Sequence, residues 1–429
     1  MALPPVHAQR VALHNEIHAR PPDAMSAPLV LSHVVMVADA AERDASRAHL
    51  AKLLRDHHLP QPDAEGIHVR MDLGGFRIRW ELHTEFVTWT FYRAIAADGL
   101  ANGEPPTALQ AVPQDWLAGL PGQTLGALHL WVLPRAGNEG KPRQLLQEDA
   151  LVGAAIANGH AEVYTDFALH ADGCSRMLLL ADPPESLTAR RLGRMVQRLL
   201  EIDTYRMAAL LGLPVARAAS GDLAQVEREL AALAEAIRAA GRDQEPQLLD
   251  RLTRLAGQVE SQYAATHSRF SASAAYFELV DRRLADIGEA KLGGLQTLGE
   301  FIERRLSPAR ATIAWSVRRQ DALSQRVSRI SNLLRTRVEI EQQQSSQALL
   351  ATMNKRQDLQ LKLQATVEGL SVAAITYYIV GLVSYVAKGV HGLGWPFSAE
   401  STAATAIPFV AFGVWWSLRR LHHRLLEEE

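Results

Sequence analysis

Four polar side chains alternate with other residues near the N-terminus, in the stretch HNEIHARPP. They are His14, Glu16, His18 and Arg20. The spacing from His14 to His18 matches the zinc motif H-E-x-x-H, but the glutamate follows the first histidine by two positions rather than one. On a helix Glu16 would lie roughly 200° from His14, so it could not serve as that motif's general base. The stretch is therefore not a metalloprotease motif.

As an extended segment, the same stretch places all four polar side chains on one face. Arg20 precedes Pro21, which favours extended backbone there. A second alternating stretch, FRIRWELHTEF at 76–86, has a face of charged and imidazole groups: Arg77, Arg79, Glu81, His83 and Glu85. Its other face is apolar: Phe76, Ile78, Trp80, Leu82 and Phe86. The alternation predicts a half-buried strand.

Two interpretations of these polar faces remain open. If they meet, His14, His18, His83, Glu81 and Glu85 supply enough ligands for a divalent cation, the only cofactor the sequence suggests. Alternatively, Arg20 and Arg79 pair with Glu16, Glu81 or Glu85 and fix the N-terminus to a sheet. Such faces on strands are commonly solvated or paired, which favours the second interpretation.

The elements that would position these residues form an α+β domain over residues 1–214. Strands are predicted at 29–38, 76–86, 125–133, 151–157, 162–170 and 175–181. Helices are predicted at 40–58 and 184–211, the second ending at the Leu-Gly of DTYRMAALLGLP. The Leu-Gly-Gly at 73–75 predicts a hairpin with GIHVRMD. Local pairing of strands favours α+β over a doubly wound sheet.

Composition excludes some classes of protein. Among 429 residues, 21% are charged and the net charge is −2, so nothing indicates nucleic-acid binding. The only cysteine, Cys174, excludes a disulfide framework or a Cys-based zinc cluster and fits a reducing compartment. The first 25 residues lack the apolar core of a secretory signal peptide. We expect the N-terminal part to fold in the cytosol.

Strand patterns end near Val215, and the chain becomes helical. Residues 215–306 predict a helical hairpin region, and 307–366 a long stalk helix with Pro308 in its first turn. Apolar residues recur along the stalk at steps of three and four: Ile313, Val317, Leu323, Val327, Ile330, Leu334 and Val338. A solvated single helix of this length is unusual, so the stripe predicts packing on another helix or subunit.

Two apolar segments follow, at 367–388 and 402–418, each near the roughly 20 residues that cross a bilayer. Trp415 and Trp416 close the second segment as interfacial anchors do, and basic residues flank the pair on one side. The positive-inside rule then puts both termini and the 419–429 tail in the cytoplasm and the 389–401 loop outside. This hydropathy favours two transmembrane helices over a buried hairpin in a soluble core.

Small and polar residues of the first span step along one face: Tyr377, Gly381 and Ser384, leading to Lys388. Such a face suits close helix packing, or a pore lining in an oligomer. Packing is the simpler interpretation. The external loop carries Gly392, Gly394 and Trp395.

Four stretches carry a resemblance to a family: NEIHARPP, RWELHTEF, DTYRMAALLGLP and VEGLSVAAITYYIVGLVSYVAKG. Together they resemble a bacterial family of predicted membrane-anchored proteins of unknown function, marked by N-E-x-H-A-R-P. This resemblance implies a protein of the bacterial inner membrane with a cytosolic body. The order of parts is also similar to the CorA-type magnesium transporters, which have an N-terminal cytosolic domain, long stalk helices and two C-terminal spans. That resemblance implies a pentamer with the first span lining a pore. The Gly-Met-Asn of those transporters is absent here, and KGVHGLGWPF stands in its place.

The sequence therefore leaves three candidate functions. The first is a homo-oligomeric, CorA-like cation channel, transporter or sensor in the membrane. The second is a membrane-anchored module whose cytosolic domain binds a ligand or a protein. The third is a membrane-tethered, metal-dependent enzyme built on His14, His18, His83 and Glu85. No nucleophile or cofactor motif is present, which favours a protein that is not an enzyme.

Overall fold

The computed structural model describes residues 6–11, 13–14, 21–63, 66–96, 105–241, 244–391 and 398–426. The chain is a mixed α+β protein with an N-terminal sheet and long C-terminal helices. It divides into two compact units, 1–331 and 332–429. Each unit is described by itself.

A nine-stranded sheet organises the first unit, in the order β2-β3-β4-β1-β5-β8-β7-β6-β9. Its strands are β1 Leu29–Val37, β2 His68–Asp72, β3 Arg77–Leu82, β4 Phe86–Ala94, β5 Gln123–Pro134, β6 Val152–Ile156, β7 Ala161–Thr165, β8 Ser175–Ala181 and β9 Ala290–Lys291. The β5–β8 pair is parallel, and the other neighbouring pairs are antiparallel. The apolar run of β1 forms a central strand buried on both faces, as predicted.

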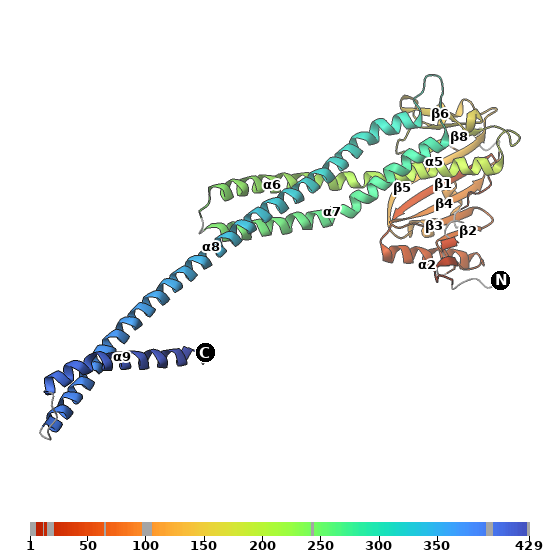
Figure 1. Cartoon of the computed structure of the whole chain (residues 1–429). Helices are drawn as coiled ribbons and strands as arrows, with labels where there is room; N and C mark the ends of the chain where they lie inside the picture. Colours follow the sequence, from red (N-terminus) through yellow and green to blue (C-terminus); the bar gives the residue numbers. More distant parts are fainter. Residues whose placement is uncertain are drawn as a thin grey trace. The chain divides into compact units, whose positions relative to one another are not determined.

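Helices cover both faces of this sheet (Figure 1). On one face, Leu50, Leu53 and Leu54 of α2 (Ala40–Asp56) pack on β1, β3 and β4, together with Trp116 of α3 (Gln114–Ala118). Asp39 and Glu42 form a capping box that starts α2. The opposite face packs against α5 (Ala189–Leu210) and α7 (Glu245–Ile287). A short helix, α4 (Lys141–Leu145), lies between β5 and β6 in the chain.

The predicted 76–86 strand is a hairpin. β3 ends at Leu82, and the backbone N–H of His83 donates to the Phe86 carbonyl at 2.9 Å, which closes a turn. The prediction that Phe86 shares a face with Trp80 is therefore wrong. Phe86 begins β4, and it lies beside Thr88 and Thr90 on the other face. The hairpin with 73–75 as its turn is confirmed, because β2 pairs antiparallel with β3.

Other element ends also differ from the prediction. β7 stops at Thr165, since the Asp166 carboxylate accepts the Ala168 N–H at 3.0 Å and turns the chain. α5 begins at Ala189, after a separate turn in which the Leu187 N–H donates to the Pro183 carbonyl at 3.0 Å.

The long helix α8 (Leu298–His391) begins ten residues before Pro308. Its start is a capping box: the Glu300 N–H donates to Thr297 Oγ1, and the Thr297 N–H donates to the Glu300 carboxylate, both at 3.2 Å. Pro308 therefore lies inside the helix. The Thr-x-x-Glu spacing was the sequence signal that could have located this start.

A helical bundle forms from α6 (Gly212–Ala239), α7 and the first part of α8. The sequence predicts a helical hairpin region at 215–306. These helices run side by side (Figure 1). Arg319 of α8 binds Glu227 of α6 through two bonds of 2.6 Å, and Gln320 donates to Thr266 of α7 at 2.9 Å. The apolar residues predicted along the stalk helix pack on other helices of the same chain in this bundle. Ile313, for example, lies in the apolar core.

The second unit consists of the rest of α8 and α9 (Ala399–Leu426). Both helices are long and apolar enough to cross a membrane, and their most apolar stretches have mean hydropathies of 1.8 and 1.3. Large apolar side chains point outward there, among them Leu370 (73% exposed) and Phe409 (79% exposed). Basic groups lie over aromatic rings at the ends of the apolar stretches: Lys388 over Tyr385, Arg419 over Trp415 and Arg420 over Trp416. This arrangement is typical of membrane interfaces.

Candidate functional site

A cavity of about 240 Å³ lies between the sheet and α5. β1, β3 and β4 form its floor, and side chains of α5 and α7 form its wall. Its lining is mostly polar: His33, Arg79, Glu81, His83, Thr88, Thr90, Gln197, Glu201, Thr204, Tyr205 and Arg283, with Phe86 and Leu200. We call the sheet side chains His33, His68, Arg70, Arg79, Glu81, Thr88 and Thr90 the polar face. The side chains Ile78, Trp80, Val87, Trp89 and Phe91 behind them are the aromatic face.

Antiparallel register brings the polar face together. Arg79 lies opposite Arg70 of β2 and Thr90 of β4, and Thr90 lies opposite His33 of β1. Because side chains alternate along each strand, these four residues project to the same side of the sheet. In the local sequence R-x-R-W-E, the charged side chains therefore lie on one side of the sheet and Trp80 lies on the other.

Arg79 is the buried centre of the network, with 4% of its side chain exposed. Its Nη2 donates to Glu81 Oε1 at 2.7 Å, and its Nη1 lies 3.8 Å from Asp23 Oδ2. Burial alone would lower the pKa of Arg79, but the neighbouring Tyr92 and the Glu81 carboxylate raise it above its ordinary value. Arg79 is therefore a permanent buried cation that needs its two carboxylates.

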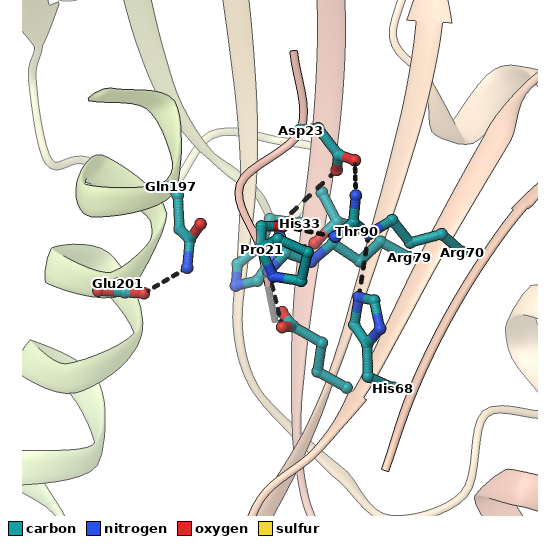
Figure 2. A network of polar contacts seen from close by, with 10 residues as sticks. Pro21, Asp23, His33, His68, Arg70, Arg79, Thr90, Gln197 and Glu201 are labelled. Atoms are coloured by element: carbon teal, nitrogen blue, oxygen red, sulfur yellow. Dashed lines mark hydrogen bonds and ion pairs between the residues drawn. The ribbon is translucent and has the colours of Figure 1, made fainter. Parts of the chain in front are cut away.

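The N-terminal segment closes the network from above (Figure 2). Arg70 donates to Asp23 Oδ1 at 2.6 Å and to the Pro21 carbonyl at 2.5 Å. Asp23 thus joins two arginines from neighbouring strands. The described part of the chain is thus attached to the sheet at Pro21 and Asp23. Of the predicted charge pairs, Arg79 with Glu81 is present, whereas those with Glu16 and Arg20 fall outside the described residues.

Gly193 of α5 is needed for this attachment. A Cβ at that position would lie 1.6 Å from the Asp23 carbonyl oxygen, so no other residue fits without moving the segment. The Met25 N–H donates to the Ala189 carbonyl at 3.0 Å, one turn earlier on the same helix. The segment that carries Asp23 is therefore seated on α5 as well as on the sheet.

His33 ties the sheet to α5. Its Nδ1 lies 2.8 Å from Thr90 Oγ1, and its Nε2 lies 3.0 Å from Thr204 Oγ1. Burial, together with the charge of Arg79, lowers the pKa of His33 to about 3. The ring is neutral at physiological pH, so its role is to hold α5 in register over the polar face.

The helical wall of the cavity carries its own charge pair. Arg283 of α7 donates from Nε to Glu201 Oε2, and Gln197 donates to Glu201 Oε1 at 2.9 Å. On the floor, Thr88 is 3% exposed, and its hydroxyl has no hydrogen-bond partner among the residues that the structure describes. A buried hydroxyl of this kind costs stability unless a bound molecule or water satisfies it.

The predicted polar residues separate into three groups. Glu81 and His83 line the cavity. Glu85 lies apart and accepts bonds from Arg269 at 2.6 Å and Tyr276 at 2.9 Å. His14 is exposed in a helical turn rather than an extended segment, since the Leu13 N–H donates to the Gln9 carbonyl.

Glu16, His18 and Arg20 fall outside the described residues, so the metal interpretation that includes them stays a prediction.

On the first apolar segment, Tyr377 is 78% exposed and Lys388 is exposed, whereas Gly381 and Ser384 are half-buried. The pore lining proposed from these four residues stays a prediction. Gly392, Gly394 and Trp395 lie outside the described residues.

Sequence reasoning missed His33, Asp23, Thr204 and Arg283. For His33 a signal was available: it is one of two polar residues in the otherwise apolar run LVLSHVVMVA. A polar group inside a fully buried strand must have partners, so it marks a contact between layers. Arg283 had no signal, because charged residues recur along the whole of α7.

Comparison with known proteins identifies one family. A family model described as "Protein of unknown function (DUF3422)" matches residues 5–425. Neither the search of curated proteins nor the search of solved structures found a match.

Proposed function

Because the chain belongs to the DUF3422 family, whose description assigns no activity, we propose a function from the cavity itself. The protein is a membrane-anchored module that binds a small polar molecule between the sheet and α5. The two apolar helices supply the anchor, and the first unit supplies the binding domain.

The observation that carries this proposal is a cavity lined by charged groups whose buried Thr88 hydroxyl lacks a partner. Its volume of about 240 Å³ is slightly below the roughly 300–1,000 Å³ of typical small-molecule pockets, which indicates a small ligand. The lining carries two arginines (Arg79, Arg283) and two glutamates (Glu81, Glu201), whose charges balance one another. His33 adds none, since its ring is neutral. A net-neutral molecule with hydrogen-bonding groups fits best, such as a zwitterionic amino acid or a polyol.

Thermal melting of the full-length protein in detergent tests this proposal. The probes are the standard amino acids, small sugars and polyols, with dicarboxylates and polyamines as charged comparisons. At 100 times its Kd, a net-neutral ligand should stabilise the protein by about 2.7 kcal/mol and raise its melting temperature. Calorimetry should then give one site per chain.

Two variants locate the site. Thr88→Val and Glu201→Gln should each weaken binding at least about tenfold, because each removes one polar partner worth about 1.5 kcal/mol. Ser273→Ala is the matched control, since Ser273 is also a buried hydroxyl without a partner but lies in the helical bundle. Absence of binding by every probe, or binding that survives both cavity variants, would overturn the proposal.

A second candidate is a homo-oligomeric, CorA-like cation channel in the bacterial inner membrane, with Tyr377 and Ser384 on the pore side. The observation that favours it is α8, a single 94-residue helix whose C-terminal part is the first apolar segment. Light scattering of the detergent-solubilised protein and cation flux into proteoliposomes test it. A pentamer with flux supports the channel, and a monomer or dimer rejects it while leaving the binding module untouched.

A further inference from the structure

A second cluster of reactive side chains lies on the aromatic-face side of the sheet, across from the cavity. It contains His129 of β5 with Asp172 and Cys174, which come from the loop before β8. One ligand atom from each residue lies within 4.8 Å of the other two. Among the residues that the structure describes, this is the one group of three His, Cys, Asp or Glu side chains so placed.

A hydrogen bond on the ring nitrogen away from Asp172 fixes the orientation of His129. His129 Nδ1 lies 2.8 Å from Ser32 Oγ, and the same oxygen accepts the Leu109 N–H at 3.3 Å. With Nδ1 engaged, the ring turns Nε2 towards the loop, where it lies 3.6 Å from Asp172 Oδ2. A second partner on the far ring nitrogen is what orients a metal-binding histidine.

The loop also holds its two side chains together. The Cys174 N–H donates to Asp172 Oδ1 at 3.0 Å, so the carboxylate turns back towards the thiol. His129 and Cys174 are buried, at 3% and 5% exposure, whereas 38% of the Asp172 side chain is exposed. The cluster thus has a buried base and one side open to solvent.

We propose that His129, Asp172 and Cys174 bind a transition-metal ion, with Zn²⁺ as the first candidate. This site lies outside the ligand cavity and does not depend on the function proposed for it. A thiolate and an imidazole select zinc-like ions, whereas Mg²⁺ and Ca²⁺ take oxygen ligands. Water completes the coordination from the open side, as in zinc sites with three protein ligands.

Charge and distance are consistent with such an ion. When the metal–sulfur bond forms, the Cys174 thiol releases its proton to solvent. The resulting thiolate and carboxylate together balance two positive charges. Ligand atoms of a tetrahedral zinc site are about 3.3–3.8 Å apart, so the side chains close by about 1 Å.

One neighbouring group opposes the metal. Arg176 Nη2 lies 3.8 Å from Asp172 Oδ2 and competes for the carboxylate. Removing that charge with Arg176→Gln should therefore tighten metal binding, an effect that a purely structural Asp–His contact does not produce.

Cobalt spectroscopy of the full-length protein in detergent tests the site. After metal is stripped with a chelator, Co²⁺ should bind once per chain and give a thiolate-to-cobalt charge-transfer band. The chain has a single cysteine, so this band can arise only from Cys174. Zn²⁺ should displace the cobalt and abolish the band.

Variants separate the roles of the ligands. Cys174→Ser should abolish the band, and Asp172→Asn should weaken binding at least about tenfold. Ser32→Ala should weaken it by about 10–100-fold, as loss of a partner behind a ligand does. His160→Asn is the matched control, since His160 lies 3.2 Å from Asp182, another Asp–His contact. A wild-type protein without the band would overturn the proposal, as would an equal effect of His160→Asn and His129→Asn.

Discussion

The two faces of β3 and β4 are both buried, yet they are held together by different forces. On the aromatic face, Trp80, Trp89 and Phe91 pack against α2, and area removed from water supplies the stability. On the polar face, Arg79 is equally buried but is held by Asp23 and Glu81. An apolar surface can be covered by many different apolar side chains. A buried cation, in contrast, destabilises the protein when one of its carboxylate partners is removed. The aromatic face therefore serves stability, whereas the polar face lines the cavity for which we propose a ligand.

The largest loss of stability is expected from the aromatic face. Trp80 is fully buried, and its Nε1–H donates to Ser46 of α2 at 3.3 Å. Trp80→Ala should lower the free energy of unfolding by about 3–5 kcal/mol. Urea unfolding followed by circular dichroism measures this loss. A decrease below about 1 kcal/mol would contradict the description of this face as the stabilising one.

Arg79→Met should cost about 3 kcal/mol, because it removes the buried cation that lies between Glu81 and Asp23. Adding Asp23→Asn and Glu81→Gln should recover at least about 1 kcal/mol of that loss. Such a recovery would show that the loss comes from unpaired buried charges rather than from lost packing. On the same strand, Arg77→Met is the control, since Arg77 is half-buried beside the Tyr92 ring. Equal losses at both arginines would show that the network has no special role.

Acid should act on the polar face through His33. Its pKa is about 3 in the folded protein and about 6.5 in the unfolded chain, so the folded state favours the neutral ring. This contribution is fully present above pH 6.5 and is lost as the pH falls towards 3. Between pH 7 and pH 5 it should cost about 2 kcal/mol, which His33→Asn removes. Unfolding at both pH values in the two proteins measures the difference, and identical pH dependence would count against the assignment.

The smallest effect on stability is expected at Thr88. Thr88→Val should change the free energy of unfolding by less than about 1 kcal/mol, since it removes a hydroxyl that has no partner. Ser273→Ala should behave alike in stability, but only Thr88→Val should reduce ligand binding. If Thr88→Val instead destabilises the protein strongly, the hydroxyl has a structural role.

Much of the fold was predictable, because period-two alternation identifies strands and caps identify helix starts. The apolar run of β1, helix α2 and the hairpin at 73–75 all follow from local pattern. Alternation separated Arg79 from Trp80, but it could not tell that both sides would be covered. The cover comes from α5, more than a hundred residues later in the chain. Long-range contacts such as His33 with Thr204 leave only a weak trace in a single sequence.

The contact between the Asp23 segment and Gly193 also affects the order in which parts of the protein can fold during synthesis. At synthesis rates of roughly 5–20 residues per second, α5 follows the Asp23 segment by on the order of 10–40 s. Helix α2 and strands β1 to β4 are made well before that, so the aromatic face can close early. The cover of Arg79 and Arg70 is completed only when α5 and its Gly193 have been made. The polar face is therefore the last part of the sheet's first half to be completed as the protein is made.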